Sequence, residues 1–200
     1  MGERRRVVLF VRAPALGGGK RRLAAEIGDL GAIRFERLMI ARLLRRLTDR
    51  RWELRIAVTP DTARHLAASW RHGTTICGQG NGDLGARMRR ALCDGTPGPV
   101  VLVGGDIPGL GPRHIAAAFR RLGAHDLVFG PAADGGFWLV GARRRLLVAG
   151  FFAQVRWSSP HALADTLAGL PRRLRVGFAD ILEDVDDGQA YRRLKPQRGF

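Results

Sequence analysis

The chain has 200 residues, of which 46% are hydrophobic, so it can bury a real core in one compact domain spanning residues 1–200. Its longest apolar runs, such as residues 7–11, fall far short of the roughly 20 residues that span a bilayer, so we expect no membrane segment. The apolar run after the basic start is too short for a secretory signal, and Cys77 and Cys93 form neither a metal-ligand spacing nor a disulfide framework. These features predict a protein of the reducing cytoplasm.

The formal net charge of +16 favours nucleic acid as a partner, because basic surfaces bind phosphate backbones. However, all but two of the 34 basic residues are arginines, and they are spread through nearly every segment. Aromatic residues, which stack on single-stranded bases, make up only 7% of the chain. We therefore keep a nucleic-acid-binding module as an alternative and favour a different function.

Apolar runs and amphipathic stretches alternate along the chain, which predicts an α/β fold. The expected strands cover residues 7–11, 54–58, 74–77, 100–103, 126–130, 136–141 and 174–178. Helices are expected from Asp29 as a cap, after Asp61 or Thr62, over 84–93 behind the cap Asp83, from Pro112, from the sequence Ser158-Ser159-Pro160, and over 187–194.

Residues 126–130 and 136–141 are too close together for a helical crossover, so we expect them to form a hairpin or bent pair. The sheet is therefore predicted to be mostly parallel, with one reversed strand. Ligands of such sheets bind at the carboxyl ends of the strands. The loops over 12–20, 78–83, 104–109 and 132–136 follow apolar runs and are expected to line one cleft.

The first of these loops, in "RAPALGGGKRRL", combines glycines with Lys20. Backbone N–H groups of a glycine-rich loop can close on phosphate oxygens, and a nearby cation neutralises them. A phosphate-binding P-loop would need glycine at Pro14 and a hydroxyl residue at Arg21, so that motif is absent. The pattern favours anion binding over a solvated turn.

The segment "GNGDLG" at 80–85 matches the spacing G-x-G-x-x-G of dinucleotide-binding folds. It lies in the third strand-to-helix unit instead of the first, which argues against a dehydrogenase. The simpler interpretation is that Asp83 caps a helix and Arg87 lies one turn later on its surface. Functionally, both side chains could face the cleft and contact a nucleotide.

Asp106 ends an apolar run in "VVLVGGDIPGL". It could cap local amides in a turn. The neighbouring glycines and Pro108 instead favour a carboxylate presented to a hard cation such as Mg²⁺, which takes one or two carboxylates and completes its shell with phosphates and water. We expect Asp106 to bind such a cation.

A second carboxylate is then needed. Asp134, in "PAADGG", could serve in function or equally as a turn residue. Asp184 and Asp186 alternate around Val185, which places both on one face of an extended segment. Acidic clusters are commonly just solvated, but this one is the densest negative stretch of a basic chain. It is therefore a credible source of a second metal ligand.

The motifs "FVRAPALGGGKRRLA", "GQGNGDLGARM", "VLVGGDIPGL", "GPAADGGFWLVG", "WSSP" and "DVDDGQAY" occur in the same order as those of a known family. The chain resembles bacterial transferases found beside radical-SAM and selenium-domain proteins, a family also named for an arsenosugar-pathway glycosyltransferase. The resemblance covers nearly the whole chain. It implies a three-layer α/β/α sandwich of the GT-A type, which is Rossmann-like and typical of nucleotide-diphospho-sugar transferases.

By this resemblance, Asp106 and Asp186 match metal-binding acids, while Lys20 and Arg22 match phosphate-contacting residues. Ala13 and Pro14 match the segment that lies along the nucleoside. The chain departs from the family pattern at several motif positions: Arg12 stands for Lys, Arg21 for Thr, Gly105 for Ser, Ile107 for Cys and Gly188 for Pro. These departures bear on the choice of nucleotide and acceptor.

The sequence therefore predicts a transferase that uses Mg²⁺ or Mn²⁺ and moves a sugar from a nucleotide-diphosphate donor to a small acceptor. Asp106 and Asp186 are expected to hold the metal, Lys20 and Arg22 to offset charge on the leaving group, and Asp134 to serve as a base or acceptor contact. The nearest alternative is a nucleotidylyltransferase, which would transfer a nucleotide from an NTP to a phosphorylated small molecule and release pyrophosphate.

Overall fold

The computed structural model describes residues 4–15, 19–67, 70, 74–95, 97–143 and 150–194. Its strands are β1 (Arg6–Arg12), β2 (Glu53–Thr59), β3 (Thr75–Gly78), β4 (Val100–Gly104), β5 (Leu127–Pro131), β6 (Phe137–Ala142) and β7 (Val176–Phe178). Its helices are α1 (Arg21–Ile27), α2 (Asp29–Leu47), the 3₁₀ turn η1 (Asp61–Ala63), α3 (Arg64–Ala67), α4 (Leu84–Cys93), α5 (Pro112–Leu122), α6 (Ala162–Ala168) and α7 (Gly188–Leu194).

The strands form one sheet in the order β3-β2-β1-β4-β6-β5-β7. Strand β6 is antiparallel to both of its neighbours, β4 and β5, and every other pairing in the described sheet is parallel. The close spacing of β5 and β6 along the chain explains the reversal, because their link is too short for a crossover. The predicted mostly parallel sheet with one reversed strand is confirmed.

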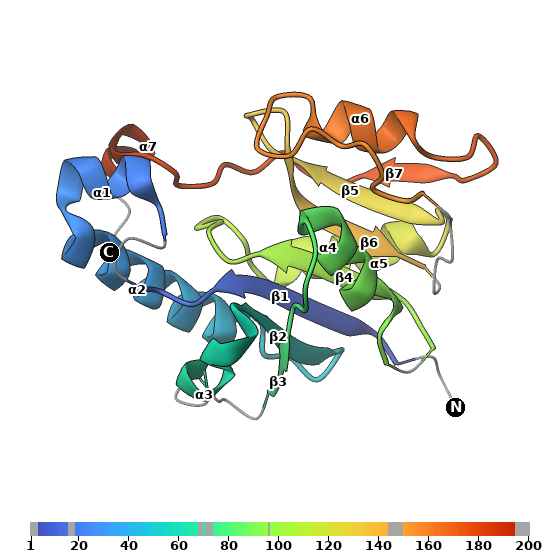
Figure 1. The fold of residues 1–200 in the computed structure, drawn as a ribbon. Coiled ribbons are helices and arrows are strands. Elements are labelled where there is room, and N and C mark those ends of the chain that lie inside the picture. The colour runs from blue at the N-terminus through green and yellow to red at the C-terminus, as the bar shows by residue number, and fades with distance from the viewer. Residues whose placement is uncertain are drawn as a thin grey trace.

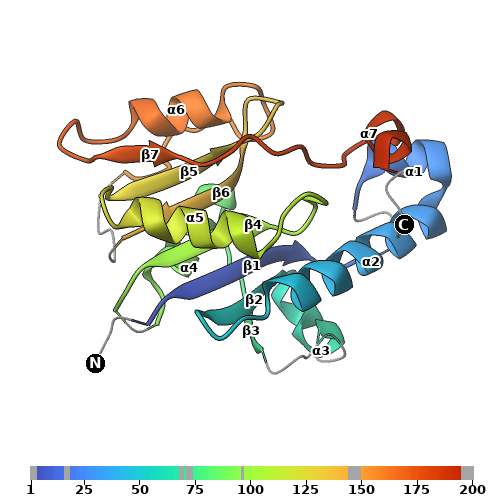
Figure 2. The ribbon, with the colours of Figure 1, turned by 180° about the vertical axis from the view of Figure 1, so that it is seen from behind.

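Helices cover both faces of this sheet, which gives the predicted three layers (Figures 1 and 2). Along β1 the side chains alternate: Val7 and Leu9 pack into one core with α2 and α5, whereas Val8 packs into the other with α4 and α6. Because β1 lies in the middle of the sheet, it is buried on both faces, which accounts for its unbroken apolar sequence.

The last part of the chain returns to the first helices. Figure 2 shows α7 beside α1 and α2, beyond the carboxyl end of β1. Glu26 of α1 ties them together: its carboxylate accepts hydrogen bonds from the Gly188 backbone N–H at 3.0 Å and from Arg192 at 2.6 Å. Residues 179–187 therefore cross the carboxyl edge of the sheet on the way to α7.

Several predicted boundaries differ from the structure. Helix α1 was not predicted, because it is only seven residues long and buries only Leu23. Gly28, with φ 75°, separates α1 from α2, so Asp29 is the first residue of α2 instead of its cap. The helix expected from Ser158 begins at Ala162, and the last strand is limited to Val176–Phe178. Asp83 caps α4 as predicted, its carboxylate accepting from the Ala86 N–H at 2.7 Å.

Within the described part of the chain, no helix is long and apolar enough to cross a membrane.

Candidate metal and ligand site

The candidate site lies at the carboxyl ends of β1 and β4. Asp106 is separated from β4 by Gly105 alone, and a Cβ on Gly105 would lie only 2.8 Å from Cγ1 of Val11 in β1. The glycine therefore lets the exit of β4 pass close against β1. As a result, Asp106 comes within reach of Lys20, which follows β1 after the glycine-rich loop.

Lys20 bridges two of the predicted metal ligands. Its Nζ donates to Oδ2 of Asp106 at 3.0 Å and to Oδ1 of Asp186 at 2.5 Å. The Lys20 side chain is 10% exposed, whereas those of Asp106 and Asp186 are 39% and 46% exposed. Burial would lower the pKa of Lys20, but the two carboxylates outweigh it and raise that pKa above its ordinary value. The lysine is therefore a charged group that already offsets part of the negative charge of the site.

The segment 184–186 supplies two carboxylates to this centre. Val185 is buried, and its backbone N–H donates to the Asp106 carbonyl at 3.2 Å, which fixes the segment against the β4 exit loop. Oxygen atoms of Asp106, Asp184 and Asp186 all lie within 4.8 Å of one another. Burial, followed by the charges of Asp186 and Asp106, raises the pKa of Asp184 to about 6.

This set of ligands suits a divalent cation. Carboxylate oxygens are the hard donors that Mg²⁺ and Mn²⁺ prefer, and three of them converge here around a site that attracts an ammonium group. The sequence predicted Asp106 and Asp186 as ligands, with Asp184 on the same face as Asp186. The structure brings all three together.

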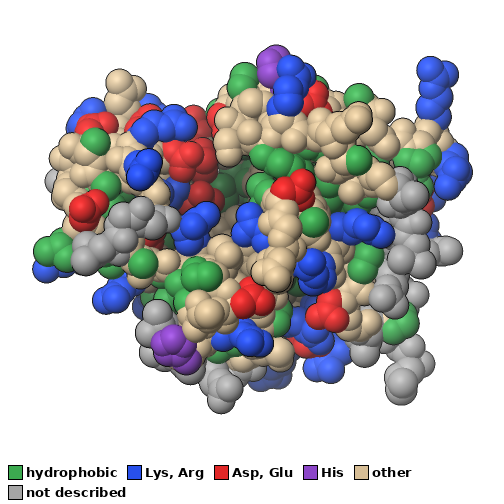
Figure 3. Space-filling view, viewed as in Figure 1, with side chains coloured by type: hydrophobic (Ala, Val, Ile, Leu, Met, Phe, Trp, Pro, Cys, Tyr) green, Lys and Arg blue, Asp and Glu red, His purple; other side chains and the backbone are tan. Residues whose placement is uncertain are grey.

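Two hollows meet at these carboxylates. The first hollow, of about 600 Å³, extends between β1 and α2, and the second hollow, of about 680 Å³, extends toward the β5–β6 turn and α6. Both are lined in part by Asp106, Asp186, Arg22, Phe137 and Ser158. Figure 3 shows acidic side chains gathered beside a recess with a hydrophobic floor.

The other predicted residues take different places. Arg22 is exposed and lines both hollows, whereas Ala13 and Pro14 are buried and line neither. Asp83 and Arg87 also lie outside the described lining. The Arg87 guanidinium donates to the Gln79 side-chain oxygen at 2.9 Å, so it lies against the loop that follows β3.

Asp134 is exposed at the rim of the second hollow, where its carboxylate accepts the Gly136 N–H at 2.9 Å. This hydrogen bond stabilises the turn, which is one of the two roles that the sequence predicts for Asp134. The hydrogen bond uses Oδ1 only, so the same carboxylate can still contact a ligand in the hollow.

Sequence reasoning did not single out Glu36 of α2. It lines the first hollow, and burial raises its pKa, although Lys20 and Arg12 oppose the shift. The sequence carried no signal for it, because a charged residue on a helix is ordinarily a solvated one.

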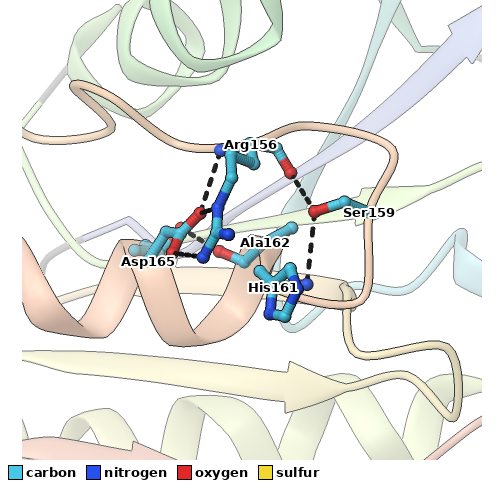
Figure 4. A network of polar contacts seen from close by, with 6 residues as sticks. Arg156, Ser159, His161, Ala162 and Asp165 are labelled. Atoms are coloured by element: carbon cyan, nitrogen blue, oxygen red, sulfur yellow. Dashed lines mark hydrogen bonds and ion pairs between the residues drawn. The ribbon is translucent and has the colours of Figure 1, made fainter.

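Residues 156–161 form a braced loop, held by the polar contacts that Figure 4 shows, and residues 157–160 of this loop line the second hollow. Arg156 holds Asp165 of α6 through two side-chain hydrogen bonds of 2.8 Å. Ser159 closes the loop, since its hydroxyl donates to the Arg156 carbonyl at 2.6 Å and accepts from the His161 N–H at 3.2 Å. Between them Ser158 adopts φ 57°, which is uncommon for a residue other than glycine, and lines both hollows.

Comparison with known families gives a match over residues 42–159 to the family described as "Uncharacterized protein conserved in bacteria (DUF2064)". The chain belongs to the DUF2064 family. A comparison with curated proteins found no significant match. The DUF2064 match spans β4, the β5–β6 turn and the braced loop, and it stops before Asp184 and Asp186.

Solved structures extend the comparison over nearly the whole DUF2064 chain. A protein of Desulfovibrio desulfuricans G20, provisionally named a nucleotide-diphospho-sugar transferase, is 29% identical, with a TM-score of 0.85 over 97% of this chain and 89% of that one. A CMP:2-keto-3-deoxy-manno-octonic acid synthetase complexed with CTP is 13% identical, with a TM-score of 0.60 over 97% and 98% of the two chains.

The glucosyl-3-phosphoglycerate synthase of Mycobacterium tuberculosis, solved in complex with Mn²⁺ and uridine diphosphate, is 14% identical, with a TM-score of 0.55 over 92% of this chain and 71% of that one. The last two likenesses show the fold alone. Together the three structures support a GT-A-like fold for this DUF2064 protein.

Proposed function

We propose that the protein is a metal-dependent transferase that moves a sugar from a nucleotide-diphosphate donor to a small acceptor. The observation that carries the proposal is the meeting of Asp106, Asp184 and Asp186, two of which accept from the Lys20 ammonium, where two hollows join. Such a junction lets a donor in one hollow and an acceptor in the other meet beside a cation. The 29% identical transferase-like relative supports this assignment.

The first hollow is the proposed donor site. The basic residues Arg12, Lys20 and Arg21 line it, and Arg22 lines its junction with the second hollow. These four side chains can neutralise a diphosphate, because charge-assisted hydrogen bonds to phosphate oxygens are among the strongest that side chains make. By the family resemblance, Ala13 and Pro14 match the segment that lies along the nucleoside, although neither lines the first hollow in this structure. Asp83 and Arg87, which the sequence offered as nucleotide contacts, also lie outside its lining.

Asp106 and Asp186, joined by Asp184, are the proposed ligands of Mg²⁺ or Mn²⁺. A divalent cation there would draw charge from the diphosphate and so stabilise it as a leaving group. Lys20 would then exchange its carboxylate partners for phosphate oxygens, which keeps its charge paired throughout. Arg22, exposed at the junction, would share the charge that develops on the leaving diphosphate.

In the proposed reaction an acceptor hydroxyl oxygen forms a bond to the anomeric carbon of the sugar. The bond between that carbon and the diphosphate oxygen breaks, and the nucleoside diphosphate leaves with the electron pair. The hydroxyl proton passes to a carboxylate at the rim of the second hollow, for which we propose Asp134. We further propose that one domain, residues 1–200, carries the whole reaction and that it works in the cytoplasm. We also propose that the protein belongs to the transferase family found beside radical-SAM proteins.

A thermal-shift panel tests the proposal. The protein is mixed with UDP-, GDP-, dTDP- and CDP-sugars, with NTPs, or with a single-stranded oligonucleotide, each with and without MnCl₂. A ligand at 100 times its Kd adds about 2.7 kcal/mol, which corresponds to roughly 5 to 10 °C for a chain of this size. Asp106→Ala is compared with Asp94→Asn, which changes an exposed carboxylate outside both hollows.

We expect a metal-dependent shift with one nucleotide sugar that is lost in Asp106→Ala and retained in Asp94→Asn. Metal-dependent nucleotide binding that survives Asp106→Ala would contradict the proposal. Turnover of CTP or GTP with release of pyrophosphate would assign the protein to the nucleotidylyltransferases instead. A shift with the oligonucleotide alone, indifferent to metal and sensitive to salt, would assign it to nucleic-acid binding.

A further inference from the structure

The two hollows carry opposite charge. Among the described residues that line only the first hollow, Arg12, Lys20 and Arg21 face one acid, Glu36. Among those that line only the second hollow, the one basic residue is Arg193, and the acids are Asp134, Glu183, Asp184 and Asp187. With the shared residues Asp106 and Asp186, the second hollow gathers six of the 18 acidic residues of a chain whose net charge is +16.

A metal ion would not cancel this excess. The cation site uses Asp106, Asp184 and Asp186, so Asp134, Glu183 and Asp187 remain. Arg193 lies 3.9 Å from Glu183, so its guanidinium is already paired with one of the three. Asp187 lies at the start of α7, where its carboxylate accepts the Ala190 N–H at 2.8 Å. The outer part of the second hollow therefore stays negative when the centre is neutralised.

The inner wall of the second hollow is aromatic. The rings of Phe137 and Trp157 pack edge to face with their centroids 6.2 Å apart, and both residues line the hollow. Aromatic faces attract cations, and they also bury the apolar part of a small ligand. A negative rim around an aromatic wall is suited to a cation with an apolar body, and it repels phosphate and carboxylate groups.

We propose that the second hollow is the acceptor site and that it selects an acceptor bearing a positive charge, such as a primary amine, beside an apolar face. The inference rests on the proposed function, since it names the substrate class of the hollow opposite the donor. It separates the transferase from the rival reaction, because a phosphorylated acceptor would bring at least one negative charge against three carboxylates outside the metal set, only one of which is paired with an arginine in the described part of the chain.

Three probes that share one scaffold test the charge preference: tyramine, which carries an ammonium group, tyrosol, which carries a hydroxyl, and 4-hydroxyphenylacetate, which carries a carboxylate. Each is titrated by calorimetry into the full chain at about 0.15 M ionic strength, where surface charges beyond roughly 8 Å are screened. The titrations are run on the protein alone and on the protein loaded with MnCl₂ and UDP or GDP. Binding of the nucleotide and metal is measured first, so that the proposed function is tested separately from the preference for a charged acceptor.

The variant Asp134→Asn combined with Glu183→Gln removes two of the three remaining charges. Asparagine can still accept the Gly136 N–H, so the turn is kept. The matched control is Asp49→Asn, which removes one carboxylate that likewise accepts an N–H two residues on, from Arg51 at 2.9 Å, and which lies outside both hollows.

We expect tyramine to bind best and 4-hydroxyphenylacetate at least about tenfold more weakly, with tyrosol between them. The double variant should flatten this order, and Asp49→Asn should preserve it. Equal or tighter binding of 4-hydroxyphenylacetate, an order that survives the double variant, or no binding of any probe to protein that binds nucleotide would overturn the proposal. If the three probes bind in the expected order but the protein binds no nucleotide in the presence of Mn²⁺, the second hollow is not an acceptor site. The missing nucleotide binding would separately count against the proposed function.

Discussion

Lys20 and Asp106 lie 86 positions apart in the chain, and their side chains meet at 3.0 Å where β1 and β4 end side by side. The ammonium group therefore occupies the place where a metal ion would neutralise the same carboxylate. The ion pair and the metal compete for the same oxygen atoms, which makes Lys20 a counter-ion of the site in the absence of ligand.

Replacing Lys20 by Met should change metal and nucleotide binding in opposite directions. Without the ammonium group, Asp106, Asp184 and Asp186 repel one another, so Mn²⁺ alone should bind on the order of tenfold more tightly. Binding of a nucleotide diphosphate should weaken, because a phosphate contact is lost. Calorimetric titration of MnCl₂ with and without UDP measures both effects. Unchanged or weaker Mn²⁺ binding in Lys20→Met would show that the ion pair does not compete with the metal.

Asp184 should make stability depend on pH. Its pKa is raised to about 6 in the folded protein, above the ordinary value of 3.8, so the folded state holds this proton more tightly than the unfolded state. The contribution is fully present below about pH 4 and is lost as the pH rises through about 6. Asp184→Asn should therefore raise the melting temperature at pH 7.5 and flatten this part of the profile. Melting curves of both proteins without metal, from pH 4 to 8, measure the effect, and a lower melting temperature for Asp184→Asn at pH 7.5 would contradict it.

The fold could be predicted largely because its signals are local. Buried parallel strands are apolar throughout, as in β1 and β4, and the short link between β5 and β6 dictates the reversed strand. Helix α1 escaped prediction because seven residues with one buried side chain carry no amphipathic period. Its place depends on Glu26 and α7, which are contacts from the far end of the chain.

The site could be predicted only as a set of residue types. The alternation of Asp184 and Asp186 around Val185 indicated their shared face, and the structure joins both to Asp106. The sequence indicated that Lys20 binds an anion, but it could not indicate that the anion is a carboxylate when no ligand is present. The opposite charge of the two hollows was also beyond prediction, because Asp106 and Asp134 join the acidic segment 183–187 from distant parts of the chain.

The brace between Arg156 and Asp165 should matter more for function than for stability. Arg156 is exposed and Asp165 lies at the surface of α6 with 18% of its side chain exposed, so loss of this ion pair should lower the melting temperature only modestly. It holds the loop that carries Ser158 into both hollows, and misplacing a ligand contact by about 1 Å can slow a reaction on the order of 100-fold. Arg156→Ala should therefore reduce the rate of sugar transfer, measured as nucleoside diphosphate release, far more than its melting temperature suggests.

The control for that experiment is Arg51→Ala. Arg51 holds Asp49 through its Nε and a terminal nitrogen, as Arg156 holds Asp165, but the Arg51 pair lies outside both hollows. Equal losses of transfer rate in the two variants would mean that the brace around Ser158 acts only through stability.

Replacing Gly105 by alanine should disturb both the stability of the protein and the position of the metal ligand Asp106. A Cβ at this position would lie 2.8 Å from Cγ1 of Val11 and 3.2 Å from the Phe10 carbonyl oxygen, and both atoms belong to a buried central strand that has no room to shift. Gly105→Ala should therefore destabilise the protein by about 1 to 3 kcal/mol and weaken Mn²⁺ binding, because Asp106 moves with the strained loop. In Gly109→Ala, four residues along the same loop, the new methyl group meets only Leu182 at an ordinary 3.7 Å, so stability and Mn²⁺ binding should stay close to those of the parent protein. Urea unfolding and calorimetry of the two variants measure the difference, and a Gly105→Ala protein as stable as Gly109→Ala would show that β1 and β4 do not hold Asp106 in place.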